Sequence, residues 1–165
     1  MKDQHKWHVF VGTEVGLLKG VDIENKTFSN LNSVDALDKE DEITAMCWED
    51  STEKKIYVGD KNQTVKTYDS ETQAFISTRQ CQVGEGAIKG LGRCNDHLVT
   101  AVESGIVKLW NKEAEKEVEI NTGGNLCRMT QNPFADLQVA TGGEENDLKV
   151  WDLATSQKVF EAKKC

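Results

Sequence analysis

The feature that most constrains this chain is a short segment that recurs four times. Each copy is a run of alternating apolar residues, ending in Val, Tyr or Trp followed by Asp or Asn. The copies are Gly16-Leu-Leu-Lys-Gly-Val-Asp22, Thr64-Val-Lys-Thr-Tyr-Asp69, Gly105-Ile-Val-Lys-Leu-Trp-Asn111 and Asp147-Leu-Lys-Val-Trp-Asp152. Their penultimate residues follow one another at spacings of 47, 42 and 41. A repeat period of roughly 20 to 50 residues indicates a fold built from stacked copies of one supersecondary unit.

Two further regularities accompany the repeat. A lysine lies two residues before the penultimate position in every copy, at Lys19, Lys66, Lys108 and Lys149. A second run of period two precedes each copy and stops at a turn, over 8–14, 55–62, 97–104 and 137–145. Alternation of this kind, interrupted by Gly, Asn and acidic residues, is typical of antiparallel hairpins. The chain is therefore expected to be almost entirely β.

A repeat of about 40–45 residues that ends in Trp-Asp is the signature of WD repeats, each of which forms a four-stranded propeller blade. The sequence predicts an all-β WD-repeat β-propeller with about four blades, an incomplete ring relative to seven. The blades are expected at about 7–32, 42–81, 86–121 and 125–163. Their third strands are expected at about 17–21, 64–68, 106–110 and 147–151. The four lysines could form a row that binds phosphate groups. We favour the alternative that the aliphatic part of each side chain covers the aromatic residue two positions later.

The blades depart from the usual WD pattern. The Gly-His pair before the first strand is absent, and the turn position that usually holds Asp is occupied by Asn62, Ser104 and Glu145. The hydrogen-bond network of Asp, His, Ser/Thr and Trp is thus expected to be incomplete in every blade. The run Val9–Val11 aligns with second strands such as Ile56–Val58, so blade 1 is expected to lack its innermost strand. An open ring with unpaired edges is expected to associate or aggregate.

Several strings outside the Trp-Asp frame resemble one family more closely. They are Phe10-Val-Gly-Thr-Glu-Val-Gly-Leu-Leu-Lys-Gly20, Gly84-Glu-Gly86, Gly90-Leu91, Leu126-Cys-Arg-Met129 and Ala140-Thr-Gly-Gly-Glu-Glu-Asn-Asp-Leu-Lys-Val-Trp-Asp-Leu153. The strings occur in this order and spacing over about residues 7–163. In them the chain resembles the N-terminal half of the proteins in a WD-repeat family of large-subunit ribosome assembly factors.

That resemblance implies a nucleolar, non-enzymatic seven-bladed propeller that joins pre-60S particles. It also implies association with a AAA-ATPase and with the RNA helicase of the nuclear exosome during pre-rRNA processing. Since the family's propeller needs about seven repeats, a chain with four is expected to be a shortened form. The alternative function is a generic WD-repeat adaptor, such as a substrate receptor or chromatin reader, unrelated to ribosomes.

The net charge and the hydropathy of the chain limit the kinds of partner that are expected. Lys and Arg number 20 against 28 Asp and Glu, a net charge of −8. Domains that bind nucleic acid usually carry a basic excess, so direct RNA binding through this part is not expected. No apolar run approaches the roughly 18 residues of a membrane span, and no membrane contact is expected.

No motif for catalysis or metal binding is found. The three histidines lie far apart, the five cysteines include no CxxC pair, and no phosphate-binding loop precedes a helix. We expect no enzyme activity, cofactor or metal. Cys47 and Cys127 fall in predicted first strands, where small buried apolar residues are expected.

The partner surface is expected on one face of the propeller. The turns from second to third strand and the loops into first strands emerge there, and they carry Glu14, Asp41, Glu42, Asp60, Glu85, Glu103, Glu144 and Glu145, with Lys61 as the only opposing charge among the turns. Clustered like charge steers a complementary partner and repels phosphate. Our candidates for docking a basic protein segment are Glu14, Glu85, Glu103, Glu144 and Glu145. The alternative is that these acids are the polar residues usual in surface turns and bind no partner.

Arg128 is the sixth candidate. It lies on a predicted first strand, which lines the propeller axis, and by alternation it is expected to face away from Cys127 and Met129. It either engages a partner through the central channel or pairs with a carboxylate of its own blade.

Overall fold

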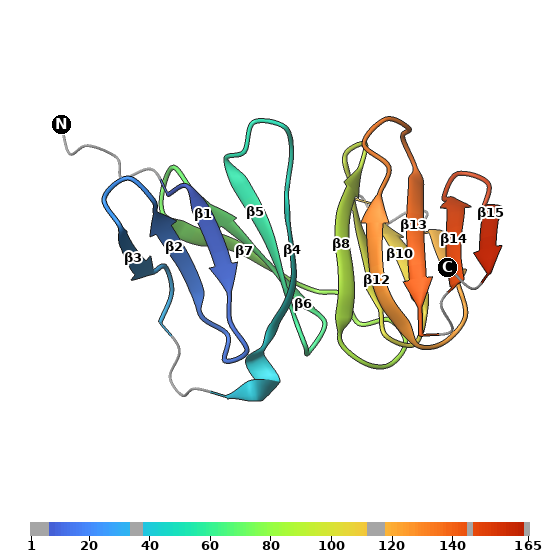
Figure 1. Ribbon diagram of the computed structural model, residues 1–165, viewed down its shortest axis with the longest axis horizontal. Coiled ribbons are helices and arrows are strands. Elements are labelled where there is room, and N and C mark those ends of the chain that lie inside the picture. The colour runs from blue at the N-terminus through green and yellow to red at the C-terminus, as the bar shows by residue number, and fades with distance from the viewer. Residues whose placement is uncertain (1–6, 34–37, 112–117, 145–146, 164–165) are drawn as a thin grey trace. The chain divides into compact units, whose positions relative to one another are not determined.

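The computed structural model describes residues 7–33, 38–111, 118–144 and 147–163 (Figure 1). Within these ranges the chain forms fifteen strands and one short 3-10 helix, so the all-β expectation is confirmed. The chain divides into two compact units, Met1–Gln80 and Cys81–Cys165. No helix in the described ranges is long and apolar enough to cross a membrane.

The first unit contains two antiparallel sheets. The first sheet has three strands, β1 (Val9–Gly12), β2 (Leu18–Asp22) and β3 (Thr27–Asn30). The helix η1 (Lys39–Asp41) leads into a four-stranded sheet of β4 (Ile43–Trp48), β5 (Lys55–Asp60), β6 (Thr64–Asp69) and β7 (Ala74–Gln80).

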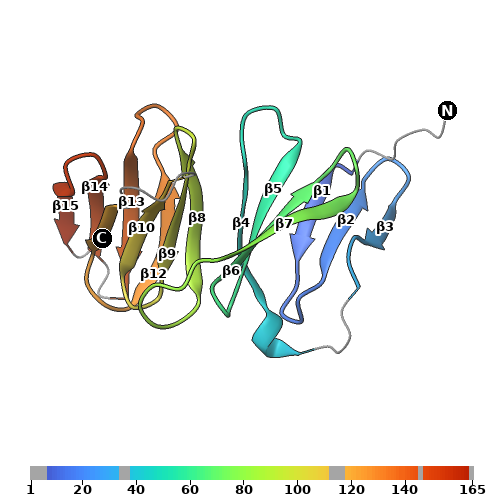
Figure 2. The same cartoon turned by 180° about the vertical axis from the view of Figure 1, so that it is seen from behind.

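The second unit contains two four-stranded antiparallel sheets. One comprises β8 (Ile88–Cys94), β9 (His97–Val102), β10 (Ile106–Trp110) and β11 (Val118–Asn121). The other comprises β12 (Leu126–Gln131), β13 (Gln138–Gly143), β14 (Asp147–Asp152) and β15 (Gln157–Lys163). In every sheet, strands adjacent in sequence are adjacent in space, as both views show (Figures 1 and 2).

The expected third strands are confirmed. The shared segments form β2, β6, β10 and β14, and each pairs antiparallel with the strand before it. Among the described residues the first sheet has no strand ahead of β1, which pairs only with β2. Residues 1–6, which precede this sheet, lie outside the described ranges, so the expectation that it lacks an innermost strand stays a prediction.

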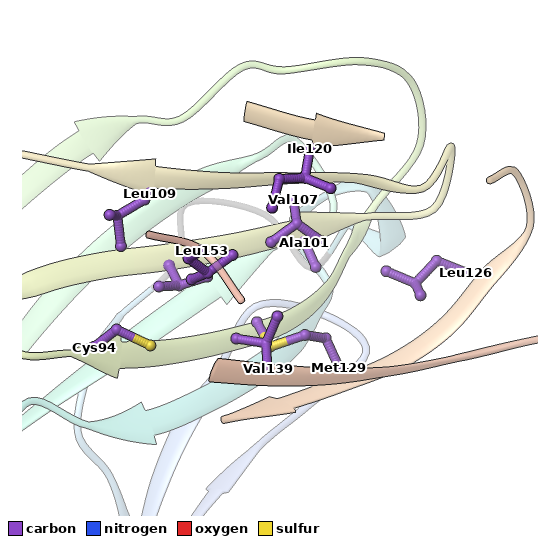
Figure 3. Close-up of a cluster of buried hydrophobic side chains, with 10 residues drawn as sticks. Cys94, Ala101, Val107, Leu109, Ile120, Leu126, Met129, Val139 and Leu153 are labelled. Carbon is purple, nitrogen blue, oxygen red and sulfur yellow. The ribbon is translucent and has the colours of Figure 1, made fainter. Parts of the chain in front are cut away.

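The core of the second unit joins its two sheets. Val139, Leu153 and Ala101 are fully buried and pack with Leu126 and Met129 (Figure 3). The first strands of the two sheets approach closely, because a Cβ on Gly90 of β8 would lie 2.6 Å from the Cβ of Met129. Only glycine leaves room for that approach.

A bulge recurs in all three four-stranded sheets. The register between first and second strands shifts at Ile43/Ala45, Ile88/Gly90 and Leu126/Arg128. Each bulge places one extra residue at the start of the first strand, which breaks the alternation of side chains there. Cys127 is the extra residue of β12 and is exposed, so its expected burial was wrong. Cys47 lies beyond the bulge of its strand and is half-buried.

The usual hydrogen-bond network of WD repeats was expected to be incomplete, and part of it is present in the second unit. The indole Nε1 of Trp110 donates to Thr100 Oγ1 at 2.9 Å, and that of Trp151 donates to Thr141 Oγ1 at 3.1 Å. These bonds tie the third strand to the second in each sheet. The four-stranded sheet of the first unit has different residues at these two positions. Tyr68 takes the place of Trp, and Val58 stands where the threonine would be, opposite Lys66.

The hydroxyl of Tyr68 is buried and has no hydrogen-bond partner among the described residues. Its ring packs edge-on against Phe75, with centroids 5.4 Å apart. Phenylalanine would keep this packing and remove an unsatisfied polar atom. Tyr68→Phe is expected to leave the free energy of unfolding unchanged or to raise it by about 1 kcal/mol. Urea unfolding followed by far-UV circular dichroism measures this, and a loss of more than about 1 kcal/mol would contradict it.

Candidate partner surfaces

The turns and loops of the second unit form one acidic surface. Ser104 N–H donates to the carbonyl of Glu85 at 3.0 Å, which holds the β9–β10 turn against the loop before β8. Leu126 N–H donates to the carbonyl of Glu103 at 2.8 Å, and Glu144 N–H donates to that of Asn125 at 3.1 Å. These bonds bring three of the predicted residues onto neighbouring turns. We call Glu85, Glu103 and Glu144 the acidic turn surface.

All three carboxylates of the acidic turn surface are exposed. Among the described residues, one cation is paired with them, since Lys89 Nζ lies 3.7 Å from Glu103 Oε1. Glu103 also reaches the loop before β8, where its Oε2 accepts from Ala87 N–H at 3.4 Å. The surface therefore presents more negative than positive charge, with Glu103 partly neutralised.

A pocket of about 190 Å³ lies beside Glu144, between the loop at Thr122–Gly124 and the start of β14. Its floor carries an ion pair, Lys149 Nζ to Asp147 Oδ2 at 2.5 Å, and the same ammonium donates to the carbonyl of Thr122 at 3.1 Å. The hydrogen bond from Lys149 lowers the pKa of Asp147. Lys149 thus serves to join the two sheets of its unit, a role that neither interpretation of the lysines had anticipated.

The other lysines of the repeat lie on or near aromatic rings or in solvent. Lys108 Nζ lies 4.2 Å from the ring centroid of Trp110, and Lys19 Nζ lies 5.1 Å from that of Phe28. Lys66 is exposed. Covering of an aromatic ring is confirmed for Lys108, whereas Lys19 covers a ring on the neighbouring strand instead.

The first unit distributes its acids differently. Glu14 is exposed and lies 3.9 Å from Lys39, and the ammonium of Lys61 lies 2.7 Å from Glu40. Asp60 was expected at the surface but is buried, because it caps its own turn by accepting from Thr64 N–H at 2.8 Å. Desolvation raises the pKa of Asp60. Of the acids expected on this face in the first unit, Glu14 is thus paired with a lysine and Asp60 is buried.

Arg128 is exposed and forms no ion pair with a carboxylate among the described residues. The bulge at Cys127 leaves Cys127 and Arg128 both exposed, while Met129 is buried. The expectation that Arg128 faces away from both neighbours was therefore wrong for Cys127 and right for Met129. Glu145 lies outside the described residues.

Sequence reasoning passed over one exposed group. Phe134 lies in the turn between β12 and β13 and is 96% exposed. The available signal was the preceding Asn132-Pro133 dipeptide, which favours a turn and so places the next residue at its tip.

The described residues offer few groups for metal binding or thiol chemistry. No group of three His, Cys, Asp or Glu side chains there is placed to hold a metal ion. Cys81 and Cys94 are buried. Burial raises the pKa of Cys47 to about 12 and also raises that of Cys94.

Cys127 is accordingly expected to be the fast-reacting cysteine of the described residues. In a Cys165→Ser background at pH 8, a maleimide should modify Cys127 about tenfold or more faster than Cys47, Cys81 or Cys94, since the thiolate is the nucleophile. Mass spectrometry of peptides at timed quenches measures this. Adding Cys127→Ser should remove the fast phase, and a fast phase that persists would contradict the expectation.

The chain was compared with protein-family models and with known proteins. The chain matches no protein-family model. It is 41% identical, over 96% of its residues, to WD repeat-containing protein 74 of Mus musculus and of Bos taurus. It is 39% identical to the Homo sapiens protein over the same share. The chain is a WD-repeat protein.

The chain spans 43% of the length of these relatives. Its similarity to WD repeat-containing protein 74 covers both units, and so covers all of the candidate residues from Glu14 to Glu145. The sheets of this WD-repeat chain correspond to one three-stranded and three four-stranded blades.

Proposed function

We propose that this WD-repeat chain is a non-enzymatic scaffold in the assembly of the large ribosomal subunit and in pre-rRNA processing in the nucleolus. The observation that carries the proposal is the 41% identity, over 96% of the chain, to WD repeat-containing protein 74. The strings that lie outside the Trp-Asp frame support it, because a generic WD repeat does not require them. The proposed partners are proteins of the pre-60S particle, a AAA-ATPase and the RNA helicase of the nuclear exosome.

The proposed docking site is the acidic turn surface. Its three exposed carboxylates lie on turns joined by backbone hydrogen bonds, so they keep their spacing when a partner binds. A basic protein segment complements this charge, whereas the phosphate backbone of RNA is repelled by it. Contacts with rRNA, if the assembly makes them, are assigned to other parts of the particle.

Sedimentation tests the scaffold role. The tagged chain is expressed in cells, nuclear extract is run on a sucrose gradient, and fractions are blotted for pre-60S proteins. The chain is expected in the pre-60S fractions, and an unrelated tagged WD-repeat chain is expected near the top. Recovery of the chain only near the top would contradict the ribosomal role and favour the generic adaptor.

Charge reversal tests the surface. The triple variant Glu103→Lys, Glu144→Lys and Glu145→Lys is expected to lose most of its pre-60S association, and the loss should be larger at about 50 mM salt than at about 150 mM, because salt screens exposed charges. The matched control reverses three other acids, Glu24, Glu53 and Glu119, and so has the same net charge. Equal association of both variants at both salt concentrations would contradict the assignment, as would tight binding of free RNA by the unmodified chain through this surface.

A further inference from the structure

Phe134 is the most exposed large apolar side chain among the described residues, at 96%. It lies between β12 and β13, at the tip of the turn. An exposed aromatic ring forgoes about 1.5–3 kcal/mol of burial, and aromatic residues contribute most of the binding energy at many interfaces. The ring is therefore available to a partner at no cost to the core.

The turn that carries Phe134 is held in one conformation. The side-chain Oδ1 of Asn132 accepts from Phe134 N–H at 2.9 Å, and its Nδ2 donates to Gln138 Oε1 at 3.2 Å. Asn132 N–H closes the turn on the carbonyl of Gln138 at 2.9 Å. Pro133, between them, has a fixed φ. A ligand that is already in its bound conformation loses less entropy on binding.

A second turn of the chain shows that the fold itself does not need an aromatic ring there. The β4–β5 turn has the same length, and Glu49 N–H closes it on the carbonyl of Lys55 at 2.8 Å. Its tip is Ser51-Thr52, and Thr52 N–H donates to Asp50 Oδ1 at 2.8 Å. Polar residues thus close a turn of the same length, although its positive φ falls at Glu53, one position earlier than the corresponding Leu137. Closing a turn of this length therefore does not require an aromatic residue.

One carboxylate without a paired cation among the described residues lies on the same turn as the ring. Asp136 follows it on the same turn and is exposed, with the side-chain amide of Asn95 3.2 Å from its carboxylate oxygens. The β8–β9 turn thereby brings the exposed Asp96, paired with Arg93, close to the β12–β13 turn. A partner that covers Phe134 would meet the Asp136 carboxylate at the rim of its binding site, whereas the charge of Asp96 is already offset by Arg93.

We propose that Asn132-Pro133-Phe134 is a docking turn for a second protein. The partner is a module with an apolar pocket deep enough for a phenylalanine ring, lined to accept the Asn-Pro-Phe turn as it stands, and with a basic rim facing Asp136. Binding buries the Phe134 ring in that pocket without rearranging the turn. This docking turn is distinct from the acidic turn surface, and the proposal does not depend on the ribosomal role.

The test uses an EH domain, a module that binds Asn-Pro-Phe turns through an apolar pocket, as the probe. The whole chain is titrated with the purified domain by isothermal titration calorimetry. Saturable binding is expected, and Phe134→Ser should weaken it at least tenfold. Asn132→Ala, which keeps the ring but frees the turn, should weaken it several-fold. Phe28→Ser, which removes another exposed aromatic residue, should leave the affinity unchanged.

Far-UV circular dichroism and the urea midpoint establish that each variant keeps the fold, as expected for exposed positions. No saturable binding by the unmodified chain would overturn the proposal. Binding that Phe134→Ser leaves unchanged would overturn it too, since contacts elsewhere would then account for the affinity. Neither result bears on sedimentation with pre-60S particles, so the two proposals fail separately.

Discussion

Replacing Gly105 by alanine is expected to lower the free energy of unfolding by more than about 3 kcal/mol. Gly105 ends the β9–β10 turn with φ +88°, a conformation that costs other residues about 1–3 kcal/mol. A Cβ there would lie 1.7 Å from the carbonyl oxygen of Gly123. The clash is with backbone, so a rotamer change cannot relieve it.

The backbone at Gly105 is also held in place. Its carbonyl accepts from both the N–H and the hydroxyl of Thr122, each at 2.8 Å. Moving the chain away from Gly123 would break these bonds, which connect the β9–β10 turn to the loop before β12. The strain of Gly105→Ala therefore adds to the loss of buried hydrogen bonds.

Gly124 provides the matched control. A Cβ there would meet no atom within 4 Å, and the residue does not have a positive φ. Gly124→Ala should change the free energy of unfolding by less than about 0.5 kcal/mol. Urea unfolding followed by tryptophan fluorescence measures both variants. Equal stability of Gly105→Ala and the unmodified chain would show that the turn relaxes, contrary to this account.

The second large effect is expected at Trp110. Trp110→Phe should cost about 1–3 kcal/mol, because the buried hydroxyl of Thr100 loses its indole donor and the smaller ring leaves space. The ring also stacks under the Lys108 ammonium, 4.2 Å from the centroid. Phenylalanine keeps an aromatic face for that contact but binds the cation more weakly than indole.

A double-mutant cycle separates the hydrogen bond from the packing. Thr100→Val removes the acceptor and keeps the side-chain shape, and the double variant leaves a pair without a hydrogen bond, as Val58 and Tyr68 are in the first unit. The coupling energy between Trp110→Phe and Thr100→Val is expected to be about 1 kcal/mol. Zero coupling would assign the whole effect of Trp110→Phe to packing.

Trp110 and Tyr68 occupy the same place in two sheets and are expected to respond in opposite ways. Removing the polar atom of Trp110 breaks a bond of 2.9 Å, whereas removing that of Tyr68 breaks none within the described residues. The contrast follows from a single difference on the neighbouring strand, Thr100 in one sheet and Val58 in the other.

Much of the fold was determined by the sequence alone. The period-two runs and the recurring Asp or Asn after Val, Tyr or Trp placed β2, β6, β10 and β14, since alternation and turn preference act over a few neighbouring residues. The same register showed that β1 is equivalent to a second strand. Family-specific strings led to WD repeat-containing protein 74, which the comparison then supported.

The tertiary structure decided what alternation could not. Cys127 is exposed because β12 gains an extra residue against β13, and a bulge is a property of two paired strands rather than of either sequence. Asp60 is buried because its carboxylate caps a turn, while Glu103 meets Lys89 only after β8 and β9 have paired. Local pattern sets which residues alternate, whereas charge pairing and exposure depend on which strands and loops come together.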